Sequence, residues 1–172
     1  MLELILGGAR SGKSRLAEEK ARLSALEVTY VATGQARDEE MAQRIALHKK
    51  NRPGHWGLVE EPLFLADALK HNQQEGRLLL VDCLTLWLSN HLLDGSGYQR
   101  WQQEKRALLD FLPHGISPTI LVSNETGLGV VPMGELNRLF VDEAGWLHQD
   151  LASLSDRVTL TVAGLPLVLK GE

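Results

Sequence analysis

Short apolar runs alternate along this chain with longer segments in which apolar residues recur every three or four positions. The short runs are rich in Leu, Ile and Val, which is typical of strands that are covered on both faces of a sheet. We therefore expect strands at Leu2–Leu6, Val28–Thr33, Arg77–Asp82, Pro118–Ser123 and Arg157–Ala163, with a short last strand at Leu165–Lys170.

The longer segments have the spacing of amphipathic helices. This spacing predicts helices at Lys13–Leu26, Asp38–Asn51, Leu63–Asn72, Leu84–Leu93, Tyr98–Leu112 and Met133–Leu154, with a break of the last helix near Gly145 left open. The segment Asn51–Pro62 holds two prolines and two glycines and has little periodicity, so we expect a loop there.

The order of these elements predicts the fold class. Strands that alternate with helices indicate parallel pairing, because each helix carries the chain back to the starting edge of the sheet. We expect an α/β fold with a mostly parallel central sheet and helices on both faces. A chain of 172 residues fits one domain, residues 1–172, and is long enough to bury a sizeable core.

Composition narrows the class of protein further. The balance of 44% hydrophobic and 23% charged residues is that of an ordinary globular protein, and the net charge of -4 argues against a nucleic-acid binder. The single cysteine, Cys83, cannot form an internal disulfide. The start of the chain lacks the features of a signal peptide, and we expect no membrane span. These observations predict a cytoplasmic protein.

One segment carries a phosphate-binding pattern. The residues Gly7-Gly8-Ala9-Arg10-Ser11-Gly12-Lys13-Ser14 match G-x-x-x-x-G-K-[ST] between a predicted strand and a predicted helix. Backbone N–H groups of such a loop converge on an anion, and the helix adds the positive end of its dipole. We expect Lys13 to reach the β- and γ-phosphates of a nucleotide and Ser14 to coordinate Mg²⁺. The pattern favours a P-loop NTPase-like fold over a glycine-rich turn without a ligand, and it leaves Arg10 open between phosphate contact and solvent.

A phosphate loop of this kind needs an acidic partner for the metal at the end of a neighbouring strand. Asp82 ends the apolar run Arg77–Asp82 and fits that role, which makes Ser14 and Asp82 the predicted metal ligands. The alternative is an acidic cap of the helix that follows. The sequence has no NKxD-type guanine-reading motif, which favours a small kinase-like transferase over a GTPase switch.

A basic stretch supplies a candidate nucleophile. The segment Arg44–Arg52 carries two arginines, two lysines and His48, and cations of this kind can hold triphosphate charge during transfer. A neutral histidine can attack phosphorus and form a covalent intermediate. The alternative is a structural histidine near a helix C-terminus, and His55 competes within the same region. The remaining histidines, His71, His91, His114 and His148, are interpreted as structural or solvent-facing.

Four segments together resemble one family. They are the phosphate loop, Ala32-Thr33-Gly34, the stretch with Arg44-Ile45, His48, Arg52-Pro53 and Trp56, and Asn124-Glu125-Thr126-Gly127-Leu128-Gly129-Val130-Val131-Pro132. This combination resembles the bifunctional adenosylcobinamide kinase / adenosylcobinamide-phosphate guanylyltransferase family of cobalamin synthesis, over nearly the whole chain. Some relatives carry two adjacent histidines where this chain has Leu47-His48.

The resemblance implies two activities. Similar enzymes phosphorylate adenosylcobinamide with ATP or GTP and then transfer GMP from GTP to that phosphate, through a guanylylated histidine that falls on His48. The implied catalytic residues are therefore His48 and Lys13. The implied nucleotide contacts are Gly7, Gly8, Ala9, Arg10, Ser11, Gly12, Lys13, Ser14, Ala32, Thr33, Gly34, Lys49, Lys50, Asn51, Arg52, Glu60 and Asp82, with Glu61 as the neighbour of Glu60 that could replace it.

Several points stay open at this stage. Asn124 and Glu125 follow a predicted strand and either shape the corrinoid or metal side of the site or hold a glycine-rich turn. The partners implied are small molecules (GTP, ATP, adenosylcobinamide and its phosphate) and a homo-oligomer, with a trimer as the state that the resemblance implies. Two other functions remain: a P-loop small-molecule kinase without guanylyl transfer, and a nucleotide-binding module without catalysis.

Overall fold

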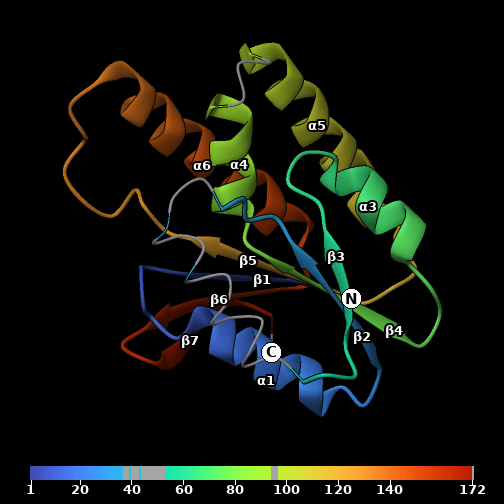
Figure 1. Cartoon of the computed structure of the whole chain (residues 1–172). Helices are drawn as coiled ribbons and strands as arrows, with labels where there is room; N and C mark the ends of the chain where they lie inside the picture. The colour runs from blue at the N-terminus through green and yellow to red at the C-terminus, as the bar shows by residue number, and fades with distance from the viewer. Residues whose placement is uncertain (37–38, 40–42, 44–52, 94–96, 172) are drawn as a thin grey trace.

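The computed structural model describes residues 1–36, 39, 43, 53–93 and 97–171. Within them, one sheet has the strand order β3-β2-β4-β5-β1-β6-β7 (Figure 1). Neighbouring strands pair in parallel except β6 and β7, which pair antiparallel. The strands are β1 (Leu2–Gly7), β2 (Glu27–Ala32), β3 (Gly57–Glu60), β4 (Arg77–Asp82), β5 (Thr119–Asn124), β6 (Arg157–Val162) and β7 (Leu165–Lys170).

The described helices cover both faces of this sheet. They are α1 (Lys13–Leu23), α3 (Leu65–Asn72), α4 (Leu84–Leu93), α5 (Gly97–Phe111) and α6 (Glu135–Leu154), with a 3₁₀ turn at Leu112–His114. Figure 1 shows α1 on one side of the sheet and α3, α4, α5 and α6 on the other. The predicted α/β architecture, a mostly parallel sheet with helices on both faces, is therefore confirmed.

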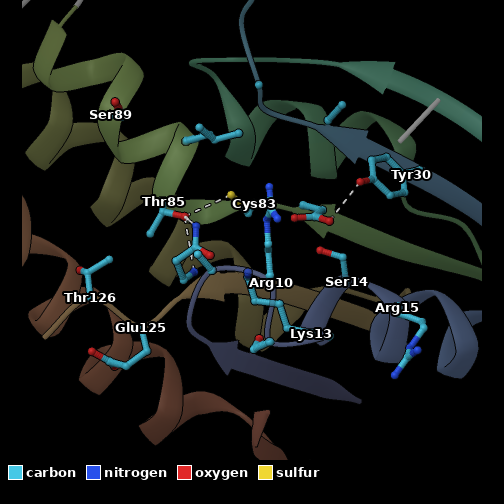
Figure 2. Close-up of a pocket in the computed structure, with 18 of the residues that line it drawn as sticks. Arg10, Lys13, Ser14, Arg15, Tyr30, Cys83, Thr85, Ser89, Glu125 and Thr126 are labelled. Atoms are coloured by element: carbon cyan, nitrogen blue, oxygen red, sulfur yellow. Dashed lines mark hydrogen bonds between the residues drawn. The ribbon is translucent and has the colours of Figure 1, made fainter. Parts of the chain in front are cut away.

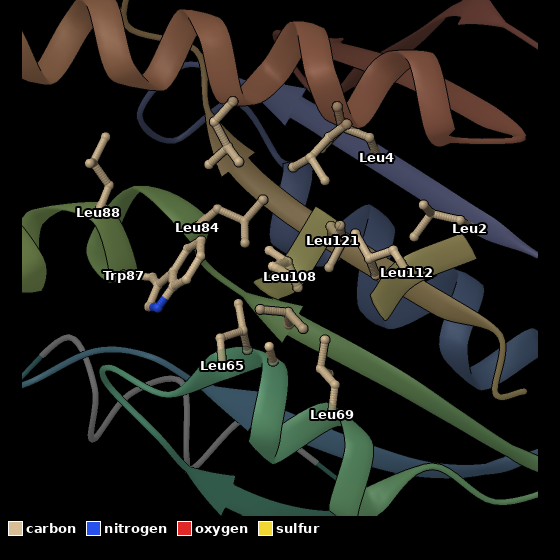
Figure 3. Packing of buried hydrophobic residues seen from close by; sticks show 14 of the residues in the cluster. Leu2, Leu4, Leu65, Leu69, Leu84, Trp87, Leu88, Leu108, Leu112 and Leu121 are labelled. Atoms are coloured by element: carbon tan, nitrogen blue, oxygen red, sulfur yellow. The ribbon is translucent and has the colours of Figure 1, made fainter. Parts of the chain in front are cut away.

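Two apolar clusters hold the layers together. The larger cluster joins alternate strand residues such as Leu4 and Leu121 to the helices on the α6 side, where Trp87 and Leu108 are fully buried (Figure 3). The smaller cluster packs α1 against the opposite face through Ala17, Ala21 and their neighbours. Because β1, β2, β4 and β5 each contribute to both clusters, their apolar runs in the sequence are nearly continuous.

The prediction of a loop across Asn51–Pro62 was wrong for its second half. Residues Gly57–Glu60 form β3, which pairs in parallel with β2 and closes one edge of the sheet. A strand of four residues is too short to show a clear period in the sequence. Its structure depends on the hydrogen bonds that β2 supplies, which a local pattern does not reveal.

Helix boundaries differ from the predictions by a few residues. The helix α1 ends at Leu23, three residues early, and the Ser24 hydroxyl then donates to the Ala21 carbonyl. The helix α6 begins at Glu135 and runs through Gly145 without a break. The predicted helix Asp38–Asn51 lies outside the described residues, except for positions 39 and 43. Across the described part of the chain, none of the helices combines the length and apolarity needed to cross a bilayer.

Candidate nucleotide-binding and catalytic site

The phosphate loop connects the end of β1 to the start of α1 and has the geometry its sequence predicts. Gly12 precedes the helix with φ 95° and ψ 2°, a left-handed conformation that favours glycine. Inside the loop, the Ser11 amide donates to the Gly8 carbonyl at 3.2 Å. A Cβ on Gly7 would lie 2.7 Å from the Thr161 carbonyl oxygen, so this position also requires glycine. The loop therefore turns tightly, and the backbone amides that follow it lie at the N-terminus of α1.

Two polar groups of the loop are suited to an anion. The Lys13 side chain is 8% exposed, and its ammonium donates to the Gly8 carbonyl at 3.2 Å, which holds the positive charge over the loop. The Ser11 hydroxyl oxygen is buried and has no hydrogen-bond partner among the described residues. A buried hydroxyl without a partner is costly, and a phosphate oxygen would satisfy it.

The turn between β6 and β7 supports the loop from behind. The Gly164 amide donates to the Ser11 carbonyl at 2.8 Å, and a Cβ built on Gly12 would lie 3.2 Å from Gly164 Cα. Ala163 and Gly164 also line the pocket described below. This support comes from the far end of the sequence, so no local pattern around the phosphate loop could have predicted it.

Asp82 lies at the carboxyl end of β4, on the edge of the sheet that carries the loop. The hydroxyl of Tyr30 donates to Asp82 Oδ2 at 3.2 Å (Figure 2), which orients the carboxylate from the neighbouring strand β2. Ser14 and Asp82 both line the same pocket. A hydroxyl and a carboxylate are oxygen donors of the kind that Mg²⁺ prefers, with phosphate oxygens as its further ligands.

The described residues contain no cluster of three or more His, Cys, Asp or Glu side chains that could hold a metal by itself. A site built from Ser14 and Asp82 with substrate phosphates fits this observation, because Mg²⁺ is usually bound through one or two carboxylates and the nucleotide.

A pocket of about 1070 Å³ opens over the loop. The predicted nucleotide contacts that line it are Ala9, Arg10, Ser11, Gly12, Lys13, Ser14, Ala32, Gly34, Glu60 and Asp82. Gly7, Gly8 and Thr33 are not among its lining residues. His48, Lys49, Lys50, Asn51 and Arg52 lie outside the described residues. Most of the predicted contacts that the structure describes therefore line one pocket. Arg10, whose role the sequence left open, is among them.

Thr33 has a structural role in this arrangement. Its side chain is fully buried, and its hydroxyl donates to the Cys83 carbonyl at 2.7 Å and accepts from the Cys83 amide at 3.0 Å. The Asn90 side chain donates to the Thr33 carbonyl at 2.7 Å. The Thr33 side chain does not line the pocket. Its hydrogen bonds connect the end of β2 to Cys83, the residue after Asp82.

Glu60 and Glu61 have different surroundings. Glu60 lines the pocket, at the end of β3. Glu61 Oε1 accepts hydrogen bonds from the amides of Leu63 and Phe64, each at 2.9 Å, and so shapes the entry into α3. Among the histidines, His55 is exposed and does not line the pocket.

Asn124 and Glu125 follow β5 and line the pocket as well. The Asn124 side chain donates to Thr85 Oγ1 at 2.8 Å. Glu125 Oε1 accepts from the Gly127 amide at 2.6 Å, and the Glu125 amide donates to the Gly7 carbonyl at 3.0 Å. The turn predicted at this position therefore exists, although Glu125 rather than Asn124 holds it, and both side chains still belong to the site.

Several lining residues were missed from the sequence. They are Arg15, Tyr30, Cys83, Thr85, Leu86, Ser89, Thr126, Phe140, Ala163 and Gly164. Thr85 and Ser89 could have been found, because they are polar positions four residues apart on a mostly apolar helix that begins two residues after Asp82. Cys83 is buried, and this burial together with the charge of Asp82 raises the pKa of its thiol to about 11. It is therefore a protonated, unreactive group at neutral pH.

Comparison with known proteins points in one direction. Residues 3–169 match the family described as cobinamide kinase / cobinamide phosphate guanyltransferase. The chain is 61% identical to the bifunctional adenosylcobalamin biosynthesis protein CobP of Pseudomonas aeruginosa, covering 100% of this chain and 99% of that protein. It is 37% identical to the bifunctional adenosylcobalamin biosynthesis protein CobU of Escherichia coli, covering 99% of this chain and 100% of that protein.

Solved structures share the fold at low identity. The flagellar accessory protein FlaH of Methanocaldococcus jannaschii has a TM-score of 0.52 at 16% identity, with 99% of this chain and 78% of that chain covered. The RadB recombinase has a TM-score of 0.51 at 18% identity, with 92% of this chain and 73% of that chain covered. These similarities confirm the predicted P-loop NTPase-like fold.

Proposed function

This chain belongs to the cobinamide kinase / cobinamide phosphate guanyltransferase family, and we propose that both reactions of the family use the pocket over its phosphate loop. The chain is a bifunctional enzyme of cobalamin biosynthesis. In the first reaction, ATP or GTP phosphorylates a hydroxyl of adenosylcobinamide. In the second, GMP passes from GTP to the resulting phosphate, which gives adenosylcobinamide-GDP and pyrophosphate.

The observation that carries the proposal is the composition of this one pocket. It joins a phosphate loop with a buried lysine to a strand-terminal carboxylate from β4. For the kinase step, the loop amides and Lys13 hold the triphosphate and stabilise the charge that shifts to the leaving nucleoside diphosphate. Gly34, Ala32 and Glu60 lie further along the same pocket and are our candidates for the nucleoside side.

Mg²⁺ is our proposed cofactor, with Ser14 and Asp82 as the residues that would hold it. When bound there, it would neutralise negative charge on the triphosphate. Asp82 is oriented by the Tyr30 hydroxyl at 3.2 Å, so the carboxylate is held in place before the nucleotide arrives.

For guanylyl transfer, we assign the nucleophile to His48. Its imidazole nitrogen attacks the α-phosphorus of GTP, the bond to pyrophosphate breaks, and a phosphorus–nitrogen bond forms. An oxygen of cobinamide phosphate then attacks the same phosphorus and releases the histidine. We assign Lys49, Lys50, Asn51 and Arg52 to the nucleotide as well, because the charges of the three cations would stabilise the pyrophosphate that leaves.

Labelled GTP tests this assignment. Incubation of the enzyme with Mg²⁺ and GTP labelled at the α-phosphate should leave acid-labile label on the protein. His48→Ala should abolish the label and retain at least part of the kinase activity with ATP. His55→Ala is the matched control, since His55 is an exposed histidine from the same region, and it should keep the label.

The same experiment separates the alternatives. A wild-type enzyme that phosphorylates cobinamide but never becomes labelled would be a kinase without guanylyl transfer. An enzyme that neither becomes labelled nor releases nucleoside diphosphate would be a nucleotide-binding module. Label that persists in His48→Ala and disappears in His55→Ala would move the nucleophile to His55.

We propose further that residues 1–172 act as one domain and that the enzyme is a cytoplasmic homo-oligomer, with a trimer as the expected state. The domain assignment is supported by the sheet, whose strands come from both ends of the chain. The cytoplasmic location rests on the free thiol of Cys83, the single cysteine of the sequence. The oligomer is supported by the exposed apolar residues Leu165 and Leu167 on the edge strand β7.

A further inference from the structure

Ser123, Glu125 and His148 form a connected group behind the pocket. Ser123 belongs to β5, Glu125 follows that strand, and His148 comes from the middle of α6. His148 Nε2 lies 2.8 Å from the Ser123 hydroxyl, and His148 Nδ1 lies 3.5 Å from Glu125 Oε2. Ser123 is fully buried and His148 is 7% exposed, whereas Glu125 reaches the pocket. The group therefore runs from the core of the protein to the surface of the site.

The contacts indicate which ring nitrogen carries the proton. A carboxylate can only accept, so the neutral His148 ring directs the N–H of Nδ1 toward Glu125 Oε2, 3.5 Å away. Nε2 of the neutral ring then accepts from the Ser123 hydroxyl. Burial lowers the pKa of His148, while the Glu125 charge acts in the opposite direction. The ring is thus kept neutral and in one tautomer, with its N–H directed at the carboxylate.

Glu125 lies beside the start of the phosphate loop. β5 is the direct neighbour of β1, Asn124 is opposite Gly7 in their register, and the Glu125 amide donates to the Gly7 carbonyl at 3.0 Å. In Figure 2, Glu125 and Thr126 lie on one side of Lys13, and Tyr30 and Arg15 lie on the other. The carboxylate therefore stands on the side of the loop away from Tyr30.

The other carboxylates of the described pocket are less suited to receive a proton near the γ-phosphate. Asp82 accepts the Tyr30 hydroxyl and is our candidate metal ligand. Glu60 ends β3, which is four strand positions from β1 and thus roughly 19 Å away at the usual spacing of strands. Glu125 directly follows β5, the strand adjacent to β1, and the two strands are roughly 5 Å apart by the same spacing.

We propose that Glu125 is the general base of the kinase step and that His148, backed by Ser123, is the residue that positions it. This proposal rests on the proposed kinase function. The hydroxyl oxygen of cobinamide attacks the γ-phosphorus of ATP, and the bond between that phosphorus and the β,γ-bridging oxygen breaks. The hydroxyl proton passes to the Glu125 carboxylate and later to water, and ADP leaves with the electron pair of the broken bond.

The two reactions of this enzyme provide an internal control. Only the kinase step has a neutral hydroxyl as its acceptor, so only that step needs a base for it. In guanylyl transfer, the acceptors are an imidazole and a phosphate that is already an anion. Loss of the Glu125 carboxylate should therefore slow one reaction and spare the other, although both use the same phosphate loop.

Glu125→Gln tests the assignment in the full-length enzyme. With adenosylcobinamide, Mg²⁺ and ATP, we expect kcat for cobinamide phosphate to fall on the order of 100-fold or more, with the KM for ATP within about twofold. Protein labelling by α-labelled GTP should stay within about threefold of the wild type. Asp142→Asn removes an exposed carboxylate from the same helix as His148 and should leave both reactions unchanged.

His148 tests the positioning role separately. His148→Leu should lower the kinase kcat on the order of tenfold and leave guanylylation intact, which also reports that the protein is folded. His148→Asn presents an N–H donor close to the position of Nδ1 and should restore part of the kinase activity, whereas a residue with only a packing role would not favour Asn over Leu.

Four outcomes would overturn the proposal. Equal losses in both reactions of Glu125→Gln would show that Glu125 serves the nucleotide or the turn, and unchanged kinase activity would show that it has no catalytic part. No advantage of His148→Asn over His148→Leu would remove the positioning role. A wild-type enzyme that makes no cobinamide phosphate from ATP would overturn the kinase function itself, and this result differs from the other three.

Discussion

At the scale of single residues, the phosphate loop depends on two glycines for different reasons. Gly12 needs a left-handed backbone, with φ 95°, so its requirement is conformational. Gly7 needs space, because the Thr161 carbonyl and the Ser11 side chain occupy the volume that a Cβ would fill. Both glycines belong to the sequence motif. Only the requirement at Gly7 depends on β6, a strand far away along the chain.

Gly7→Ala should therefore destabilise the whole protein. The new methyl group would force the loop away from β6, and we expect the free energy of unfolding to fall by about 1–3 kcal/mol, as for an overpacked core position. Gly8→Ala is the matched control, because nothing lies within 4 Å of a Cβ built there. Urea denaturation followed by circular dichroism measures both variants. Equal losses at Gly7 and Gly8 would mean that the loop moves as a unit and that the contact with Thr161 is unimportant.

Cys83 gives a prediction on pH dependence. Burial and the charge of Asp82 raise the pKa of its thiol to about 11, so the thiolate at pH 8 is on the order of 0.1% of the population. Alkylation by iodoacetamide should be slow in the native protein and should rise about tenfold per pH unit between pH 8 and 10. The urea-unfolded chain serves as the control, with a rate that levels off near pH 9. A native rate that levels off at the same pH would contradict the burial of this thiol.

At the scale of elements, the sequence predicts what a local pattern can encode. The six strands of six residues and the phosphate loop carry their own apolar pattern or glycine spacing, and each of these strands lies within one residue of its expected bounds. The edge strand β3 has no such period and depends on β2. The family resemblance implies a nucleotide contact at Thr33, and the structure adds that its hydroxyl is hydrogen-bonded to the Cys83 backbone. Phe140 and Gly164 enter the site only through tertiary packing, which no local signal reports.

The pairing of α5 with α6 depends on a buried carboxylate. Glu143 of α6 is fully buried and accepts from Tyr98 at 2.5 Å, from Trp101 Nε1 at 2.6 Å and from Gln102 Nε2 at 3.1 Å. Lys105 lies 3.7 Å away and supplies the opposite charge. Because three donors converge on one group, its removal leaves several polar atoms of α5 unpaired at once.

Glu143→Gln should weaken the packing of α5 against α6 and so lower the free energy of unfolding. The amide would bring two N–H groups to a place that is filled with donors, and we expect a loss of about 3 kcal/mol in the free energy of unfolding. Asp150→Asn is the control, because Asp150 also pairs with Lys105, at 3.5 Å, but its side chain is 47% exposed. It should cost less than about 0.5 kcal/mol. A similar small loss in both variants, measured by urea denaturation, would show that the buried carboxylate adds no net stability.

At the scale of the whole molecule, the sheet ends at β7, and this edge is apolar. Residues that face each other across paired strands share one face of the sheet, so Leu165 and Leu167 lie on the same face as Val162 and Leu160. Leu165 is 71% exposed, Leu167 is 56% exposed and Val162 is 57% exposed. Edge strands in monomers usually carry charges or are covered, because their free N–H and C=O groups recruit other chains.

The apolar edge at β7 is therefore our candidate contact of the proposed homo-oligomer. Light scattering coupled to gel filtration should give the wild-type enzyme a mass near three times its 19.0 kDa chain. Leu167→Lys would place a charge in the contact and should shift the mass toward that of a single chain, because an unpaired charge is costly to bury. Leu23→Lys is the control, because Leu23 is also an exposed leucine, 77% accessible at the end of α1. It should leave the mass unchanged. A wild-type mass of one chain would contradict the oligomer, and a Leu167→Lys mass equal to the wild type would place the contact on another face of the molecule.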